Sequence, residues 1–430
     1  MFEILFLLFL FAGLFKDILL STHTELPVDI TLLSGITLFT YAIFKAIHRE
    51  GGVFKFINTS CNKRLIPIGL FLIFCLWCLL TIMIGLDGEY PSKKFIHLLT
   101  HFIPLTAIFF HKNIHIKRFA YGFIIVAIGF SFFYFFTSPS IKYYEDPKLH
   151  YLDYEYITGL GLTSSMLIAP AILLSLFYIR NIIVKLSLAY LLFFMLFYVS
   201  ARGSLLALII VLIVLVYLKR KSLLPYFNEK IKPRITKIVS SILVITVILT
   251  TLISLDEYKK NTFKLSLYKN KLLLKSADDS ESWSISNYLK ERGENHRPEG
   301  KNKSILTRVW HYKFIGYELK ENPKLLIHGV GFGSYSMSCC GSDILDHPHN
   351  LILELTYETG LIGLIIFLIF IFYVIRRGLT NQLLLCFFLC LLFYLLHSMK
   401  SSSIIDLRLM FGFIALILYT NVTCLKKYRL

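Results

Sequence analysis

Long apolar runs alternate with short polar segments along most of the chain. Runs such as Ile66 to Leu86 and Leu361 to Ile375 are apolar on every helical face, whereas barrel strands would show short alternating segments. A hydrocarbon core about 30 Å thick requires roughly 20 residues of helix, because a helix rises about 1.5 Å per residue. The pattern predicts an all-α integral membrane protein, with residues 1–430 forming a single transmembrane domain.

A hydropathy window of about 19 residues predicts about 12 transmembrane helices. Their centres are expected near residues 11, 36, 76, 103, 128, 168, 191, 210, 246, 363, 390 and 416. The run from Phe2 to Leu20 is assigned as the first span, because it lacks the basic start and the small-residue cleavage site of a signal peptide.

Charge in the connecting segments predicts the orientation. Lys and Arg are concentrated in alternate segments, at Lys45 to Arg64, Lys112 to Arg118, Arg180 to Lys185, Lys219 to Lys237, Arg376 to Arg377 and Lys426 to Arg429. The positive-inside rule places these segments, and with them both termini, in the cytoplasm. The opposite segments carry acids such as Asp87, Glu89, Glu145 and Asp146.

One long loop, residues 256–349, is expected on the outer face between the ninth and tenth spans, and loops of this length are usually functional or disordered. Its first half is polar, whereas Leu306, Trp310, Phe314 and Tyr317 recur at helical spacing in its second half. They predict an amphipathic helix around residues 304–321 that lies against the membrane surface and ends before Asn322 and Pro323.

Composition excludes several classes of protein. Hydrophobic residues make up 56% of the chain and charged residues 17%, which is unlike a soluble domain. The net charge of +18 would suit a nucleic-acid partner, but most Lys and Arg lie in short loops where topology explains them. The Cys and His positions lack zinc-type spacing and no phosphate-binding loop is found, so neither a metal nor a nucleotide cofactor is expected.

His97 and His101, four residues apart, are interpreted as interhelical hydrogen-bonding groups on one face.

Two arginines are candidate ligands for an anion on the outer face. Arg202 begins the outward end of the eighth span, and Arg308 lies on the amphipathic helix. A guanidinium group suits a diphosphate, because its planar fork donates two parallel hydrogen bonds and is always charged. The alternatives are an interfacial Arg202 that reaches the lipid headgroups and a solvated Arg308.

His349, beside Pro348, closes the long loop and is a candidate general base, because its unperturbed pKa is about 6.5. His347 is the alternative base, and a purely structural histidine is the other possibility. Glu354 and Glu358 follow on one face of the tenth span, where buried acids need a partner such as Arg202.

His349-Asn350, nine further residues, and Gly360-Leu361-Ile362-Gly363 resemble the signature of bacterial O-antigen ligases. Three further blocks resemble the broader superfamily of ligases and O-antigen polymerases. They are Ser200-Ala201-Arg202-Gly203-Ser204, Ile305-Leu306-Thr307-Arg308-Val309-Trp310 and Gly329-Val330-Gly331-Phe332-Gly333.

The resemblance implies a class C glycosyltransferase-like fold with a large periplasmic loop, in a multi-pass protein of the bacterial inner membrane. It implies transfer of glycan from undecaprenyl diphosphate, without metal or nucleotide, on the periplasmic face. Arg202 and Arg308 are then expected on the donor diphosphate and His349 as the catalytic base. We also assign His347, Asn350, Gly331 and Gly333 to the substrate-binding surface.

The function expected first is an O-antigen ligase that transfers glycan to lipid A core. The same chemistry would serve a polymerase of O-antigen or capsule repeats, whose acceptor is another glycan. A transporter of a lipid-linked oligosaccharide or a small anion is the third hypothesis. It fits less well, because the ionisable residues gather at one interface rather than at mid-membrane.

Overall fold

The computed structural model describes residues 1–21, 29–50, 65–86, 88–111, 114–137, 151–198, 202–228, 303–340, 347–380, 384–401 and 403–419. Within these ranges the protein is helical and contains no strand. The N-terminal helices are α1 (Phe2–Ser21), α2 (Ile30–Glu50), α4 (Ile66–Ile84), α5 (Tyr90–Thr100), α6 (Phe102–His111), α7 (Ile116–Thr137), α8 (Tyr151–Tyr178), α9 (Ile182–Tyr198) and α10 (Arg202–Asn228). The later ones are α14 (Lys303–Glu321), α15 (Leu325–His328), α16 (Tyr335–Cys340), α17 (Leu351–Thr380), α18 (Leu385–Ser401), the 3-10 turn η2 (Ile404–Asp406) and α19 (Arg408–Tyr419).

The protein is a helical membrane protein. Four helical segments in the described part of the chain are long and apolar enough to cross a bilayer: Ile30–His48, Ile66–Ile84, Ile116–Phe133 and Leu351–Thr380. Shorter apolar segments of 10–17 residues lie in α1, α8, α9, α10, α18 and α19. Every predicted span centre falls in a described helix except the one near residue 246, which lies outside the described residues. The number of spans stays a prediction.

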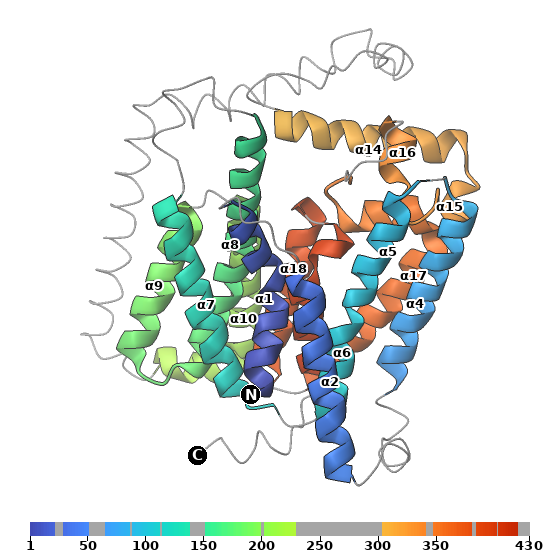
Figure 1. The fold of residues 1–430 in the computed structure, drawn as a ribbon. Helices are drawn as coiled ribbons and strands as arrows, with labels where there is room; N and C mark the ends of the chain where they lie inside the picture. The colour runs from blue at the N-terminus through green and yellow to red at the C-terminus, as the bar shows by residue number, and fades with distance from the viewer. Residues whose placement is uncertain are drawn as a thin grey trace, which may run out of the picture. The chain divides into compact units, whose positions relative to one another are not determined.

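The chain divides into two compact units. The first comprises Met1–Leu212 and Asn322–Leu430, and the second comprises Ile213–Glu321. Most helices of the first unit run roughly along one direction (Figure 1). Its interior is rich in aromatic rings: Phe71 on α4 packs against Phe102, Phe370 and Phe411, with ring centroids 4.8, 5.5 and 4.9 Å away.

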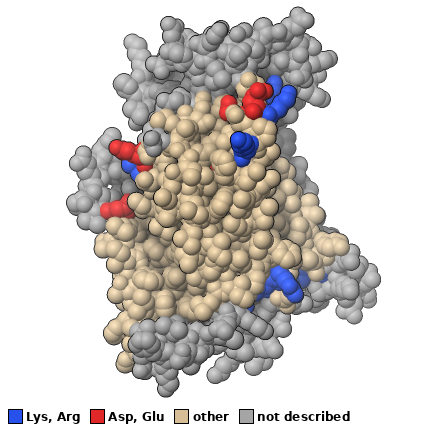
Figure 2. Space-filling view, turned by 90° about the vertical axis from the view of Figure 1, so that its right-hand side faces the viewer, with Lys and Arg blue, Asp and Glu red and all other residues tan. Residues whose placement is uncertain are grey.

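Apolar side chains also cover outward-facing surfaces of the first unit. On α17, Ile365 and Phe372 are 53% and 65% exposed, whereas Phe367 and Phe370 on the opposite side are buried. Figure 2 shows one face of the molecule, where the described residues form a broad zone without Lys, Arg, Asp or Glu, and charged side chains lie towards its top, its left edge and its lower end. This distribution fits a lipid-facing belt, because hydrocarbon solvates apolar groups and excludes charges.

The predicted fourth span is interrupted in the structure. α5 ends at Thr100 and α6 begins at Phe102, with His101 between them. Pro104 explains the break, because it has no N–H to donate to the carbonyl four residues earlier. His101 is buried, lies with Nε2 2.9 Å from the carbonyl oxygen of Ile404, and stacks on Phe411, while His97 is exposed. His101 thus links two helical segments, as expected of an interhelical hydrogen-bonding group, whereas His97 lies at an exposed position.

In the second unit, α14 covers the residues at which the sequence predicts a helix and ends before Asn322. Phe314 is buried, but Tyr317, expected on the same face, is 41% exposed. The buried positions of α14 that the structure describes are His311, Phe314 and Ile315. Contact of this helix with the membrane surface stays a prediction.

Candidate active site

A kink in α17 shapes the N-terminal end of this helix. Gly360 has φ 68° and ψ −178°, so the helical segment that begins at Leu351 is interrupted there. The interruption leaves carbonyls of the preceding turn without their intrahelical donors. The described donors to these carbonyls are the backbone N–H groups of Val330 and Gly331, which donate to Tyr357 and Glu358 at 2.9 and 3.0 Å, and Trp77 Nε1, which donates to Thr359 at 2.8 Å.

The glycine turn Gly329–Gly333 packs directly on this kink. Gly331 and Gly333 have φ of 111° and 87°, which favours glycine. A Cβ on Gly331 would lie 2.7 Å from Cα of Gly85, and one on Gly333 would lie 2.6 Å from Cα of Pro91. The structure thus places both predicted substrate-binding glycines in close contact with backbone. Their packing accounts for the glycines, and a role in binding substrate stays a prediction.

His349 and Asn350 form the turn that starts α17. Asn350 caps the helix, since its Oδ1 accepts hydrogen bonds from the N–H groups of Ile352 and Leu353, both at 3.1 Å. Its Nδ2 donates to the carbonyl of Met399 at 3.0 Å, which ties the turn to the end of α18. His349 has φ 54°, and its ring lies 4.5 Å from that of His347 in an edge-to-face arrangement. The two candidate bases are therefore adjacent.

Arg202 is the first residue of α10, and the next two residues contact α18. A Cβ on Gly203 would lie 2.6 Å from Nζ of Lys400, so this lysine side chain lies over the glycine. Ser204 Oγ lies 2.9 Å from Nδ1 of His397 and 2.7 Å from Oγ of Ser165 on α8. His397 is only 2% exposed, and its Nε2 has no hydrogen-bond partner among the described residues.

The end of α18 therefore contacts both segments of the first unit that carry predicted site residues. Met399 contacts the turn that carries His349, and Lys400 contacts the first turn of α10, which carries Arg202. The structure brings the backbones of Arg202 and His349 to the same end of the first unit.

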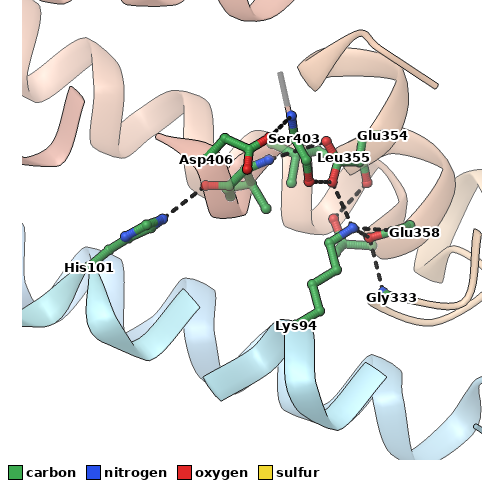
Figure 3. Close-up of polar contacts among 10 residues, drawn as sticks. Lys94, His101, Gly333, Glu354, Leu355, Glu358, Ser403 and Asp406 are labelled. Carbon is green, nitrogen blue, oxygen red and sulfur yellow. Dashed lines mark hydrogen bonds and ion pairs between the residues drawn. The ribbon is translucent and has the colours of Figure 1, made fainter. Parts of the chain in front are cut away.

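A buried ion cluster adjoins the glycine turn at Gly333, as shown in Figure 3. Lys94 of α5 points between two carboxylates of α17, with Nζ 2.6 Å from Glu354 Oε1 and 2.6 Å from Glu358 Oε2. All three side chains are fully buried. The sequence suggested Arg202 as the partner of these acids, and that expectation is wrong because Lys94 occupies this position.

One lysine cannot neutralise two carboxylates, and neutral donors complete the cluster. Ser403 Oγ donates to Glu354 at 2.5 Å, the N–H of Ile404 donates to it at 3.3 Å, and the N–H of Gly333 donates to Glu358 at 3.0 Å. Hydrogen bonds of this kind are needed to hold a buried charge. The cluster thereby connects α5, the glycine turn, the start of α17 and the turn before η2.

Arg308 lies on α14, in the second unit, whereas Arg202 and His349 belong to the first. Its Nε is buried and has no hydrogen-bond partner among the described residues. Burial lowers the pKa of this guanidinium below its usual value. An anionic ligand would supply the acceptor that this group lacks.

Residues 186–368 match the family described as O-antigen ligase. This part of the chain matches the O-antigen ligase superfamily. Its members are glycosyltransferase-like enzymes, and the superfamily includes ligases and polymerases. No curated protein matches the chain.

The matched region contains Arg202, Arg308 and His349, but Lys94, His397 and Lys400 lie outside it. None of these three residues is among the predicted site residues. Lys93 and Lys94 opposed the positive-inside rule at an outward segment, which was a usable signal. His397-Ser398-Met399-Lys400 was a second one, since it is the polar end of an otherwise apolar run.

Proposed function

We propose that this protein is a metal-independent glycosyltransferase that transfers a glycan from undecaprenyl diphosphate to an acceptor hydroxyl at the periplasmic face of the bacterial inner membrane. The observation that carries the proposal is the junction of the His349 turn and the first turn of α10 at the end of α18. It supports a site where a base and a cation face the same substrate. The unpartnered Nε of Arg308 adds support for a second cation that binds an anion.

The proposed chemistry needs little from the protein beyond position and charge. His349 accepts the proton of the acceptor hydroxyl, and the hydroxyl oxygen forms a bond to the anomeric carbon of the donor. The bond between that carbon and the diphosphate oxygen breaks, and undecaprenyl diphosphate leaves. Negative charge grows on the leaving oxygen, and the guanidinium groups of Arg202 and Arg308 stabilise it. The protein supplies orientation as well, by holding both substrates in reach.

We assign the acceptor to lipid A core, which makes the enzyme an O-antigen ligase. A polymerase would use the same residues with a second lipid-linked glycan as acceptor. The assignment rests on the spacing from His349-Asn350 to Gly360 and Gly363, which resembles the ligase signature.

Lipopolysaccharide from a strain that lacks the gene tests this assignment. We expect bare lipid A core on a gel, together with accumulated long lipid-linked polymer, and restoration when the gene is supplied. Core that carries a single repeat unit would instead identify a polymerase. Purified protein in proteoliposomes, supplied with lipid-linked donor and core acceptor, provides the direct assay. Transport of the donor without any transfer would overturn the glycosyltransferase proposal.

Replacing Arg202 with lysine should impair transfer although the charge is retained. An ammonium group cannot reproduce the two parallel hydrogen bonds of a guanidinium fork, so we expect the rate to fall about tenfold or more, the equivalent of one charge-assisted hydrogen bond. The measurement is the rate of transfer in proteoliposomes at matched protein content. Arg180→Lys is the control, because Arg180 belongs to a predicted cytoplasmic segment. Equal rates for Arg202→Lys and the unmodified protein would remove Arg202 from the donor site.

A further inference from the structure

Lys400 occupies a place between the two predicted site residues of the first unit. It is the penultimate residue of α18, is half-buried, and extends over Gly203. A Cβ on Gly203 would lie 2.6 Å from Nζ and 3.0 Å from Cε of Lys400. Glycine is therefore the residue that leaves room for the lysine at this position. Its neighbour Met399 accepts the hydrogen bond of Asn350, one residue after His349.

Two cationic residues lie close together along the chain fold at this junction. The first turn of α10 contains Arg202 and no acidic residue. A helix N-terminus already carries a partial positive charge from its free N–H groups, and Lys400 adds an ammonium group there. A phosphate group bound at this end would be stabilised both by the free N–H groups and by the ammonium group.

The side chain of His397, on α18, is a second polar group near this position. His397 precedes Lys400 by one helical turn, and its Nδ1 is 2.9 Å from Ser204 Oγ in the first turn of α10. The ring is buried, and its Nε2 has no partner among the described residues. A buried polar atom of this kind is normally satisfied by protein, water or ligand.

We propose that Lys400 binds the diphosphate of the lipid-linked donor, as a cation in addition to the arginines and from a helix outside the family match. The inference rests on the proposed function and adds a residue to the same site. An ammonium group is a compact point charge that binds phosphate oxygens without demanding a planar partner. It acts on the donor and not on the acceptor.

Donor kinetics in proteoliposomes test this role. For Lys400→Ala we expect the concentration of donor needed for half-maximal rate to rise about tenfold, the equivalent of one charge-assisted contact, with little change in the acceptor dependence. Lys400→Arg should retain most of the function because the charge is kept. Lys93→Ala is the matched control, since Lys93 is an exposed lysine of α5 that pairs with Glu89. Melting curves in detergent should be alike for all variants.

Gly203→Ala provides a second and independent variant. Its Cβ would displace the Lys400 side chain, so alone it should weaken donor use about as much as Lys400→Ala. In the Lys400→Ala background the same change should cost less than about twofold, because the residue it displaces is gone. Additive effects of the two substitutions, or unchanged donor kinetics in Lys400→Ala, would overturn the proposal.

Binding of undecaprenyl diphosphate to the purified protein separates this proposal from the proposed function. If the unmodified protein binds undecaprenyl diphosphate but transfers no glycan, the proposed function fails while the role of Lys400 is still tested by the binding measurement. Weaker binding to Lys400→Ala supports the inference in either case. Equal binding to both proteins refutes it.

Discussion

Replacing His349 with alanine is expected to abolish glycan transfer while the protein still inserts in the membrane. Loss of a general base lowers rates by about 10²–10⁴, which would leave transfer below detection in a gel assay. His349 has φ 54°, where alanine is strained, so asparagine is the better replacement. Asparagine tolerates this conformation but does not accept a proton at neutral pH. His349→Ala and His349→Asn should therefore be equally inactive, and His349→Asn should melt at the higher temperature.

His347→Ala is the matched control, because its ring lies 4.5 Å from that of His349 on the same turn. We expect it to retain measurable transfer. Full activity in His349→Asn together with its loss in His347→Ala would assign the base to His347. Activity in both variants would exclude this turn from proton transfer.

Replacing Lys94 with methionine should produce the largest loss of stability. The substitution leaves Glu354 and Glu358 buried without their cation, 2.6 Å from the position of Nζ. Removing one partner of a buried ion pair typically costs about 3–5 kcal/mol. We expect a clear drop in the melting temperature in detergent, measured by intrinsic fluorescence. Transfer should fall too, because the cluster holds the glycine turn against the start of α17.

Lys93→Met is the comparison for this variant, since Lys93 is the neighbouring lysine, is exposed, and forms an i,i+4 pair with Glu89. Such surface pairs contribute about 0.3–0.5 kcal/mol, so its melting temperature should barely change. Converting both glutamates to glutamine in the Lys94→Met background should recover part of the loss by removing the unpaired charges. Equal melting of Lys93→Met and Lys94→Met would show that the cluster contributes no net stability.

The site was predictable from sequence to different degrees. The spacing from His349-Asn350 to Gly360 corresponds to a capped helix start followed by a kink, and both depend on residue type: asparagine caps a helix, and glycine adopts φ 68°. The partner of Glu354 and Glu358 was not predictable in this way. Lys94 is 264 residues from Glu358 along the chain, and only the tertiary fold brings the two side chains together.

The sequence by itself determined the helical membrane class, the family match over residues 186–368 and the approximate centres of the described apolar helices. These properties follow from local composition, because hydrocarbon selects long apolar helices wherever they occur in a chain. The tertiary structure decided which charges meet. The position of Lys400 over Gly203 and of Lys94 between two glutamates depends on contacts between distant helices, to which periodicity along the chain is insensitive.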